Sequence, residues 1–359
     1  MPETVTDPTT SAPPDTASGA AASDDGPRAR RGRSVHMLSV RNIGAVYVWI
    51  AIIVLFSILS SDFASWQTAK AIINQYSVTA LVALSLVVPL SAAYYDLSIG
   101  FTFGLAGVLV AALLAHTSMS PVLCALITIV ACAGVGLLNA FVVIGLGVDS
   151  FIATLGTGGI LGAITLAVSD NQTVIGRVGG PFSDLASTNV GGVTLPVFYV
   201  LAVVAILGYW LERTRMGRYL YATGFDRESA RLTGIPIARI GVVAFLTSAI
   251  VAGFAGIVVA ARVSAGDPTA GPAYLIPAFS AAFLGATQLR GGRFNPYGTV
   301  IAVLLIGTGD TGLLLAGGPT WTAQLFDGLV LIAAVALTGL GQGTIRERWR
   351  RAKAQRQSA

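Results

Sequence analysis

Charged residues are scarce in this chain. They make up 11% of its 359 residues, whereas hydrophobic residues make up 54%. A soluble domain of ordinary composition carries about 25% charged residues. The composition therefore excludes a soluble globular protein and indicates a chain that lies mostly inside a membrane.

Residues that hold metals or form disulfides are also few. The two cysteines, Cys124 and Cys132, lie eight residues apart in one apolar segment. That setting predicts buried free thiols rather than a disulfide or a metal site. His36 and His116 are isolated, without an HExxH pattern or a partner at ligand spacing. The sequence thus argues against a metal-dependent enzyme, and we expect no cofactor.

Nucleotide-binding and catalytic motifs are missing as well. Lys70 and Lys353 are the only lysines, each between two alanines, so the Gly-Lys-Ser/Thr of a P-loop is absent. Residues 307–312 match GxGxxG, but they lie inside an apolar run rather than between a strand and a soluble helix. No GxSxG elbow is present. If ATP drives this protein, another subunit must bind it.

Long apolar runs fill most of the chain. A helix needs about 20 mostly apolar residues to cross the hydrocarbon core. The runs predict an all-α, polytopic membrane protein with about ten transmembrane helices. Pro272 and Pro277 interrupt the eighth run, so a re-entrant segment there stays an alternative. The ten predicted spans are 43–61, 74–93, 98–116, 121–145, 150–169, 194–211, 239–261, 272–289, 296–316 and 321–341.

Arginines are distributed unevenly between the two sides of the predicted bundle. They cluster before the first span, between the sixth and seventh, between the eighth and ninth, and after the last. With ten spans all four clusters fall on one side, while Lys70, Arg177 and Arg262 fall on the other. The positive-inside rule then predicts that both termini are cytoplasmic. The net charge of +5 reflects this topology, and we expect no nucleic-acid partner.

The ends of the chain differ from its apolar middle. Residues 1–42 are poor in large apolar residues and end in a basic cluster, which predicts a disordered cytoplasmic segment. Residues 344–359 form a basic cytoplasmic tail suited to anionic lipid headgroups. Between them, residues 43–343 form the transmembrane domain, with a charged cytoplasmic loop at 213–239.

Polar residues inside the predicted spans are costly in lipid and therefore informative. Asp96, Asn139, Gln288 and Asp310 are such residues, and together they suggest a hydrated route through the bundle. The alternatives are structural: a helix N-cap for Asp96 and an interhelical hydrogen bond for Asn139. For Asp310 we expect a position facing the route or a helix interface.

The loop at 213–239 contains a segment that favours a short helix over 226–235. Asp226 is a suitable N-cap, and Glu228 suits the positive end of the helix dipole. Gly234 can end the helix in a left-handed conformation, and Pro236 prevents its continuation. A charged helix between two membrane spans offers a surface to a soluble protein.

Several segments, in order and spacing, resemble the permease subunits of bacterial ATP-binding-cassette (ABC) monosaccharide importers of the ribose/xylose/arabinose type. The resemblance begins near residue 43 and covers nearly all of the chain that follows. Three departures are Leu275 in place of a usual acidic residue, Pro277, and Asp310 in place of a usual Asn. The segments are Asp96-Leu97-Ser98-Ile99-Gly100, Ser150-Phe151-Ile152-Ala153-Thr154-Leu155-Gly156 with Ser for the usual Pro, Gly217-Arg218, Arg231-Leu232-Thr233-Gly234-Ile235, Asp267-Pro268-Thr269-Ala270-Gly271 and Gly285-Ala286-Thr287 with Gly291-Gly292.

The resemblance implies a transport subunit of the bacterial plasma membrane that works by alternating access and is not itself an enzyme. It implies three protein partners: an ABC ATPase subunit, an extracytoplasmic sugar-binding protein and a second permease copy, expected to form a homodimer. Membrane lipid surrounds the bundle. The implied ATPase-coupling residues are Gly224, Asp226, Glu228, Arg231, Leu232 and Gly234, and the candidates for the translocation path are Asp96, Ser98, Asn139, Thr154, Gln288 and Asp310.

Two other functions stay open at the level of sequence. An ion-coupled secondary transporter could use Asp96 and Asp310 as protonation or cation sites. The charged loop at 213–239 counts against it, because such a carrier needs no docking loop. A membrane enzyme is disfavoured by the missing catalytic motifs. The sequence leaves the identity of the sugar undetermined.

Overall fold

The computed structural model describes residues 44–175, 180–287 and 292–341. All of them belong to one compact unit that spans residues 38–359. The predictions for residues 1–42, for residues 344–359 and for Gln288 fall outside the described residues.

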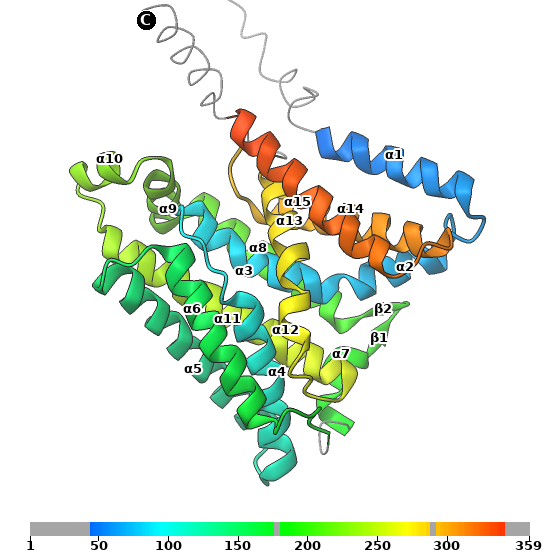
Figure 1. The fold of residues 1–359 in the computed structure, drawn as a ribbon, viewed down its shortest axis with the longest axis horizontal. Coiled ribbons are helices and arrows are strands. Elements are labelled where there is room, and N and C mark those ends of the chain that lie inside the picture. Colours follow the sequence, from blue (N-terminus) through cyan, green and yellow to red (C-terminus); the bar gives the residue numbers. More distant parts are fainter. Residues whose placement is uncertain (1–43, 176–179, 288–291, 342–359) are drawn as a thin grey trace, which may run out of the picture. The chain divides into compact units, whose positions relative to one another are not determined.

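Helices account for nearly all regular structure in the described residues (Figure 1). One antiparallel hairpin is present, in which β1 (Asn189–Val190) pairs with β2 (Val193–Thr194). The α-helices are α1 (Gly44–Leu59), α2 (Trp66–Gln75), α3 (Ser77–Ser91), α4 (Ile99–His116), α5 (Pro121–Ala140), α6 (Ser150–Val168), α7 (Asp184–Ser187), α8 (Leu195–Arg213), α9 (Arg215–Phe225), α10 (Arg227–Leu232), α11 (Ile237–Val263), α12 (Ala270–Ala273), α13 (Leu275–Ala286), α14 (Pro296–Leu315) and α15 (Trp321–Gly341).

Each predicted span overlaps a helix or a pair of helices, and the all-α polytopic class is confirmed. Among the described residues, six helices are long and apolar enough to cross a membrane: α4, α5 with the π-helical turn that follows it, α6, α8, α11 and α14. The pair α2–α3, bent by 45°, makes a seventh if it is one span. The apolar parts of α1, α12–α13 and α15 are shorter, so the count of ten stays a prediction.

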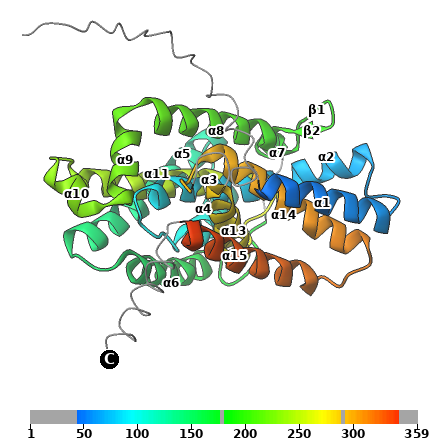
Figure 2. The same ribbon diagram turned by 90° about the horizontal axis from the view of Figure 1, so that it is seen from above.

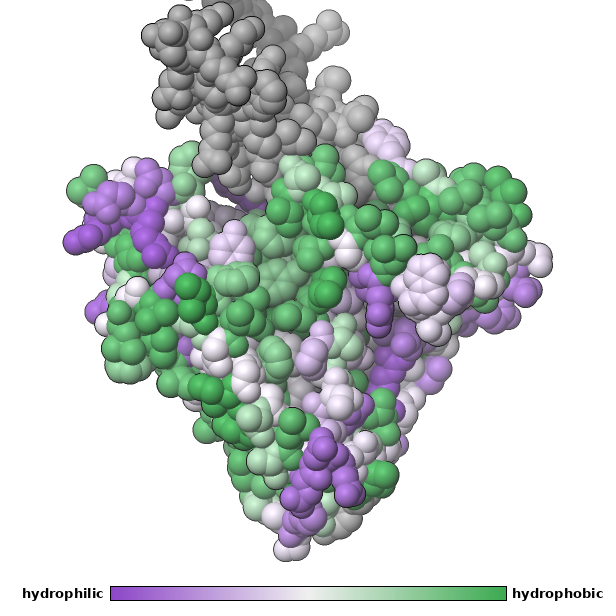
Figure 3. Space-filling model, viewed as in Figure 1, coloured by the Kyte–Doolittle hydropathy of each residue, from purple (hydrophilic) through white to green (hydrophobic). Residues whose placement is uncertain are grey.

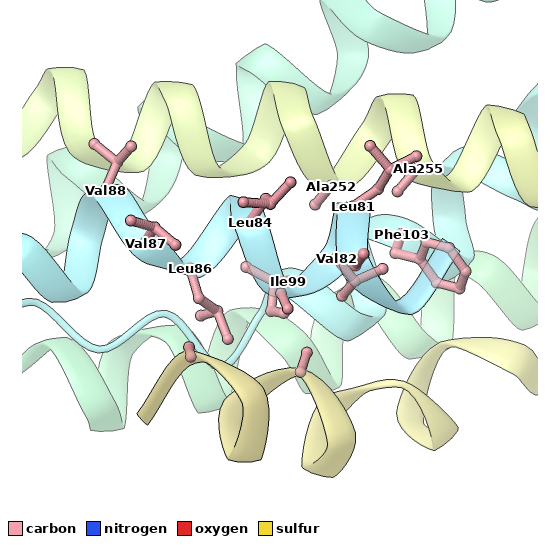
Figure 4. Packing of buried hydrophobic residues seen from close by; sticks show 14 of the residues in the cluster. Leu81, Val82, Leu84, Leu86, Val87, Val88, Ile99, Phe103, Ala252 and Ala255 are labelled. Atoms are coloured by element: carbon pink, nitrogen blue, oxygen red, sulfur yellow. The ribbon is translucent and has the colours of Figure 1, made fainter. Parts of the chain in front are cut away.

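Helix α3 forms the centre of the packed bundle. All of its 15 residues are buried. Its sequence is mostly apolar on every side, with Ser and Thr as its only polar residues, and such a helix has no face for solvent. Figure 4 shows its side chains against Ile99 and Phe103 of α4 and against Ala252 and Ala255 of α11. Helices α8, α13 and α14 also contact α3.

Glycines allow close approach between the helices, as small residues do in membranes. Gly100 and Gly104 of α4 lie against Gly271 of α12, where an added Cβ would meet backbone atoms. The GxGxxG match is also a packing surface: Gly307, Gly309 and Gly312 of α14 lie against the rings of Tyr76, Phe326 and Phe56 respectively. Both cysteines are buried free thiols, as predicted.

The surface of the bundle is apolar over its long helices. Large side chains on α5, α6, α8 and α15 are exposed, among them Phe151, Ile160, Leu201 and Ile332. In Figure 3 apolar residues cover much of the visible face, with hydrophilic residues gathered over α10 and near the lower tip. Figures 1 and 2 both place α9 and α10 on the side of the bundle away from α1 and α2. Lipid would cover the apolar surface in a membrane.

Candidate functional site

The loop at 213–239 contains two helices, α9 and α10, where the sequence predicted one. The second has the predicted N-cap. One carboxylate oxygen of Asp226 accepts hydrogen bonds from the amides of Glu228 (3.0 Å) and Ser229 (3.2 Å), and the other accepts from the Ser229 hydroxyl. These hydrogen bonds hold the pKa of Asp226 below its usual value, and the bond from the Ser229 hydroxyl contributes most to this shift. Helix α10 therefore begins with an ionised cap.

Helix α10 ends as the sequence predicted. Gly234 has a φ of 82°, a left-handed conformation that costs glycine little. The amide of Ile235 donates to the Ala230 carbonyl, and the amide of Gly234 donates to the Arg231 carbonyl. This pair of bonds is a Schellman motif. Although α10 has only six helical residues, both of its ends are fixed.

The α9–α10 segment has one face on the bundle and one face free. Ala230 is buried, and Gly224 approaches the Ser91 carbonyl too closely for any side chain. By contrast, Phe225 is 94% exposed and Leu232 is 81% exposed, with Arg231 and Glu228 also on the surface. Two large apolar side chains beside charged ones are typical of a protein interface.

A second basic loop lies against α9. The hydroxyl of Tyr221 donates a 2.7 Å hydrogen bond to the Phe294 carbonyl. The guanidinium of Arg293 lies 5.7 Å from the centre of the Tyr221 ring. The loop that carries Arg293 therefore contacts α9, and the sequence assigns both segments to the same side of the membrane.

Four of the six path candidates form one buried cluster at the connection between α3 and α4. Asp96 accepts hydrogen bonds from the amide (3.1 Å) and the hydroxyl (2.6 Å) of Ser98. The side-chain amide of Asn139 donates to the Ser98 hydroxyl at 2.8 Å. Thr154 accepts from the Leu97 amide at 2.9 Å and donates to the Tyr95 carbonyl.

The hydrogen bonds of this cluster show the structural roles of Asp96 and Asn139, while a position on the translocation path stays a prediction for both. Asn139 makes an interhelical hydrogen bond, from α5 to the start of α4. The N-cap position of α4 belongs to Ser98 rather than Asp96, because Asp96 lies two residues earlier and caps the turn that leads into the helix. Both side chains are at most 1% exposed, so no open route reaches them in this conformation.

Ser150 belongs to the same cluster, although it was not among the predicted site residues. Its hydroxyl accepts a hydrogen bond from the Tyr95 amide at 3.1 Å. The available signal was Ser150 itself, which stands where the resembling permeases have Pro. A hydroxyl can satisfy a buried amide, and the side chain of Pro cannot.

Asp310 lies in a separate polar cluster at the opposite end of α3. The Tyr76 hydroxyl, at the bend between α2 and α3, donates to Asp310 at 2.9 Å. Asp327 of α15 is buried as well, and each of the two aspartates has one buried carboxylate oxygen without a hydrogen-bond partner. Since the 15 residues of α3 extend about 22 Å at 1.5 Å per residue, Asp310 and Asp96 cannot act as one site.

A cavity of about 320 Å³ opens between α4, α11 and α12. Phe103, Tyr274, Thr173 and Asp267 line it, together with the glycine face of α4. The carboxylate of Asp267 accepts from the amide and the hydroxyl of Thr269. None of the path candidates among the described residues lines this cavity, and its walls are mainly apolar.

Comparison with known proteins gives one consistent result. The family described as "Branched-chain amino acid transport system / permease component" matches residues 68–335. The chain is 34% identical to the D-allose transport system permease protein of Escherichia coli, over 83% of this chain and 91% of that protein. It is 31% identical to the ribose import permease protein of Haemophilus influenzae (83% and 92%). Identity to the L-arabinose transport system permease protein of Escherichia coli is 30% (81% and 88%). No solved structure matches.

Proposed function

This chain belongs to the family of transport-system permease components whose model spans residues 68–335, and on that premise we propose that it is the membrane-spanning subunit of an ABC importer for a monosaccharide. The observation that carries the proposal is similarity over more than four fifths of the chain to permeases of allose, ribose and arabinose. These relatives support the importer and give no support to an ion-coupled carrier. The chain transports, and a separate subunit hydrolyses ATP.

The exposed face of the α9–α10 segment is the proposed docking surface for that ATPase. Phe225 and Leu232 supply apolar contact, and Arg231 supplies charge at the edge. Central apolar anchors with a polar rim are the usual anatomy of a protein interface. The capped ends of α10 support this role, because a helix fixed before docking loses little conformational entropy on binding.

The proposed orientation places the α9–α10 segment in the cytoplasm and the β1–β2 hairpin outside. Arg293 lies over the ring of Tyr221 in α9, so the loop that carries Arg293 contacts the arginine-rich α9–α10 segment, as the positive-inside rule expects of loops on the cytoplasmic side. On the other side, an extracytoplasmic sugar-binding protein delivers the substrate. A second copy of the chain completes a dimer, and lipid covers the remaining apolar surface.

Transport by alternating access fits the buried polar clusters. In this conformation the cluster of Asp96, Ser98, Asn139 and Thr154 is closed. Its hydroxyl and amide groups can exchange hydrogen bonds with sugar hydroxyls when the helices around it separate. ATP binding and hydrolysis on the docked subunit would drive that separation.

Uptake measurements test the proposed function. The host strain without this chain is compared with the same strain carrying it, using labelled D-ribose, D-allose and L-arabinose. The chain is expected to restore uptake of at least one monosaccharide. Restored uptake of none of these sugars, together with restored uptake of a branched-chain amino acid, would assign the chain to a different substrate class.

Cysteine labelling in intact cells tests the orientation. Both positions chosen for substitution are exposed, and the natural cysteines are buried. An impermeant thiol reagent added outside should label Ser187→Cys and leave Glu228→Cys unlabelled until the cells are opened. The opposite pattern would reverse the orientation and remove the docking surface from the cytoplasm.

A further inference from the structure

Arg227 connects the docking helix to the interior of the bundle. It is the first residue of α10, directly after the Asp226 cap. Its guanidinium carbon lies 4.4 Å from the centre of the Tyr94 ring, the geometry of a cation–π contact. Tyr94 is only 2% exposed. The neighbouring Arg231 and Leu232 are exposed on the surface of α10, whereas Arg227 contacts a buried ring.

The Tyr94 ring also contacts α11. It packs against the Phe245 ring, with 5.3 Å between centroids. Its hydroxyl lies beside Gly241, where an added Cβ would come within 2.8 Å of it. A ring in contact with both a guanidinium and a helix cannot absorb a movement of α10 by turning freely. Such a movement must pass into the backbone that carries the ring.

That backbone leads at once into the buried polar cluster. The amide of Tyr95 is bonded to Ser150, and the amide of Leu97 is bonded to Thr154. Asp96 and Ser98 follow on the same connection, and Asn139 bonds to Ser98. Because a displaced Tyr94 shifts residues attached to α5 and α6, the cluster cannot keep its present hydrogen bonds during that shift.

We propose that Arg227 and Tyr94 are positioning residues that transmit movement of the docked ATPase from α10 to the Asp96–Ser98–Asn139–Thr154 cluster. The proposal rests on the proposed function, in which α10 is the docking surface. Two faces of the α9–α10 segment then have different roles. Phe225, Arg231 and Leu232 hold the ATPase, and Arg227 passes its displacement inward.

The test uses the complete importer, purified with its own ATPase and binding protein and reconstituted in lipid vesicles. Three quantities are measured: the ATPase retained by the permease, ATP hydrolysed, and sugar taken up. Arg227→Gln and Tyr94→Leu are expected to retain the ATPase but to lower sugar uptake per ATP by about fivefold or more, the scale of energetic coupling between sites. Tyr94→Phe, which keeps the ring, is the matched control and should match the unmodified importer.

A double variant separates transmission from two unrelated defects. If the two residues act through their contact, Arg227→Gln combined with Tyr94→Leu should be no worse than either alone. Additive losses, or an unchanged ratio of sugar to ATP in Arg227→Gln, would overturn the proposal. Arg227 lies at the surface, so this variant remains informative even if Tyr94→Leu does not fold. Failure of the proposed function is distinguishable, because the unmodified chain would then show no ATP-dependent sugar uptake.

Discussion

The Tyr76 hydroxyl donates a 2.9 Å hydrogen bond to Asp310, and this bond joins the start of α3 to α14. It lies where α2 and α3 meet at an angle of 45°. The Arg262 guanidinium donates to the Asn74 and Gln75 carbonyls at the same bend. The bend is therefore stabilised from two sides, by α14 and by α11.

Replacing Asp310 is expected to cost little transport, provided that the Tyr76 bond survives. In Asp310→Asn the amide oxygen can still accept from the Tyr76 hydroxyl, so sugar uptake should stay close to that of the unmodified chain. Tyr76→Phe leaves Asp310 without this donor, and a buried polar group left unpaired costs about 1–3 kcal/mol. Melting of the purified protein should show a larger loss of stability for Tyr76→Phe than for Asp310→Asn.

The cluster at the start of α4 should be sensitive to charge. Asn139 is fully buried, and its side chain bonds to the Ser98 hydroxyl beside Asp96. Asn139→Asp places a second carboxyl group near Asp96 in a region of low dielectric. It should lower the melting temperature more than Asn139→Leu, which removes one hydrogen bond worth about 1 kcal/mol. Equal melting temperatures would show that Asp96 and residue 139 do not interact through charge.

Gly234 should be required for its backbone conformation. Its φ of 82° costs a residue with a side chain about 1–2 kcal/mol, so Gly234→Val should loosen α10 and weaken ATPase docking. Asn tolerates this conformation, so Gly234→Asn is the matched control. Amide exchange across residues 227–235 measures the loosening directly. Equal protection of these amides in both variants would contradict the role assigned to Gly234.

Capping by Asp226 should persist in mildly acidic solution. The pKa of Asp226 is lowered in the folded protein, so its contribution is complete above the unfolded pKa and is lost as pH falls through the folded pKa. Protection factors of the α10 amides should therefore be constant between about pH 5 and pH 8. Asp226→Asn should behave similarly, since Asn also caps, whereas Asp226→Ala should lose protection at every pH.

The apolar pattern of the sequence was enough to predict where the long apolar helices lie. Each predicted span overlaps a helix, because every long segment must satisfy its own backbone hydrogen bonds inside lipid. Helix α2 was missed, because its polar residues Gln67, Lys70 and Asn74 resemble a loop. Asn74 illustrates the structural role of these polar residues. Its side-chain amide donates a hydrogen bond to the Gly192 carbonyl, and its side-chain oxygen accepts one from the Thr194 amide, so it fixes the β1–β2 hairpin.

The caps of α10 could be predicted from the sequence because they depend on residues that are close together in the chain. Asp226 and Gly234 act on backbone atoms within a few positions, so spacing alone predicts their bonds. The cation–π contact of Arg227 joins residues 133 positions apart in the sequence, and no local pattern could indicate it. For the same reason the sequence could not show that Asp96 and Asp310, both considered as sites for ion coupling, lie in separate polar clusters, with Asp96 bonded to Ser98 and Asp310 bonded to Tyr76.

The energy source of uptake tests the central claim most directly. Cells carrying the chain are given the labelled monosaccharide whose uptake the chain restores. Uptake is measured with ATP depleted, and again with the proton gradient collapsed by a protonophore while ATP is maintained. Arg231→Glu, on the exposed face of α10, is compared in the same cells. We predict that uptake stops without ATP, survives the protonophore and falls in Arg231→Glu. Uptake that survives ATP depletion but stops with the protonophore would contradict the assignment as an ABC importer permease.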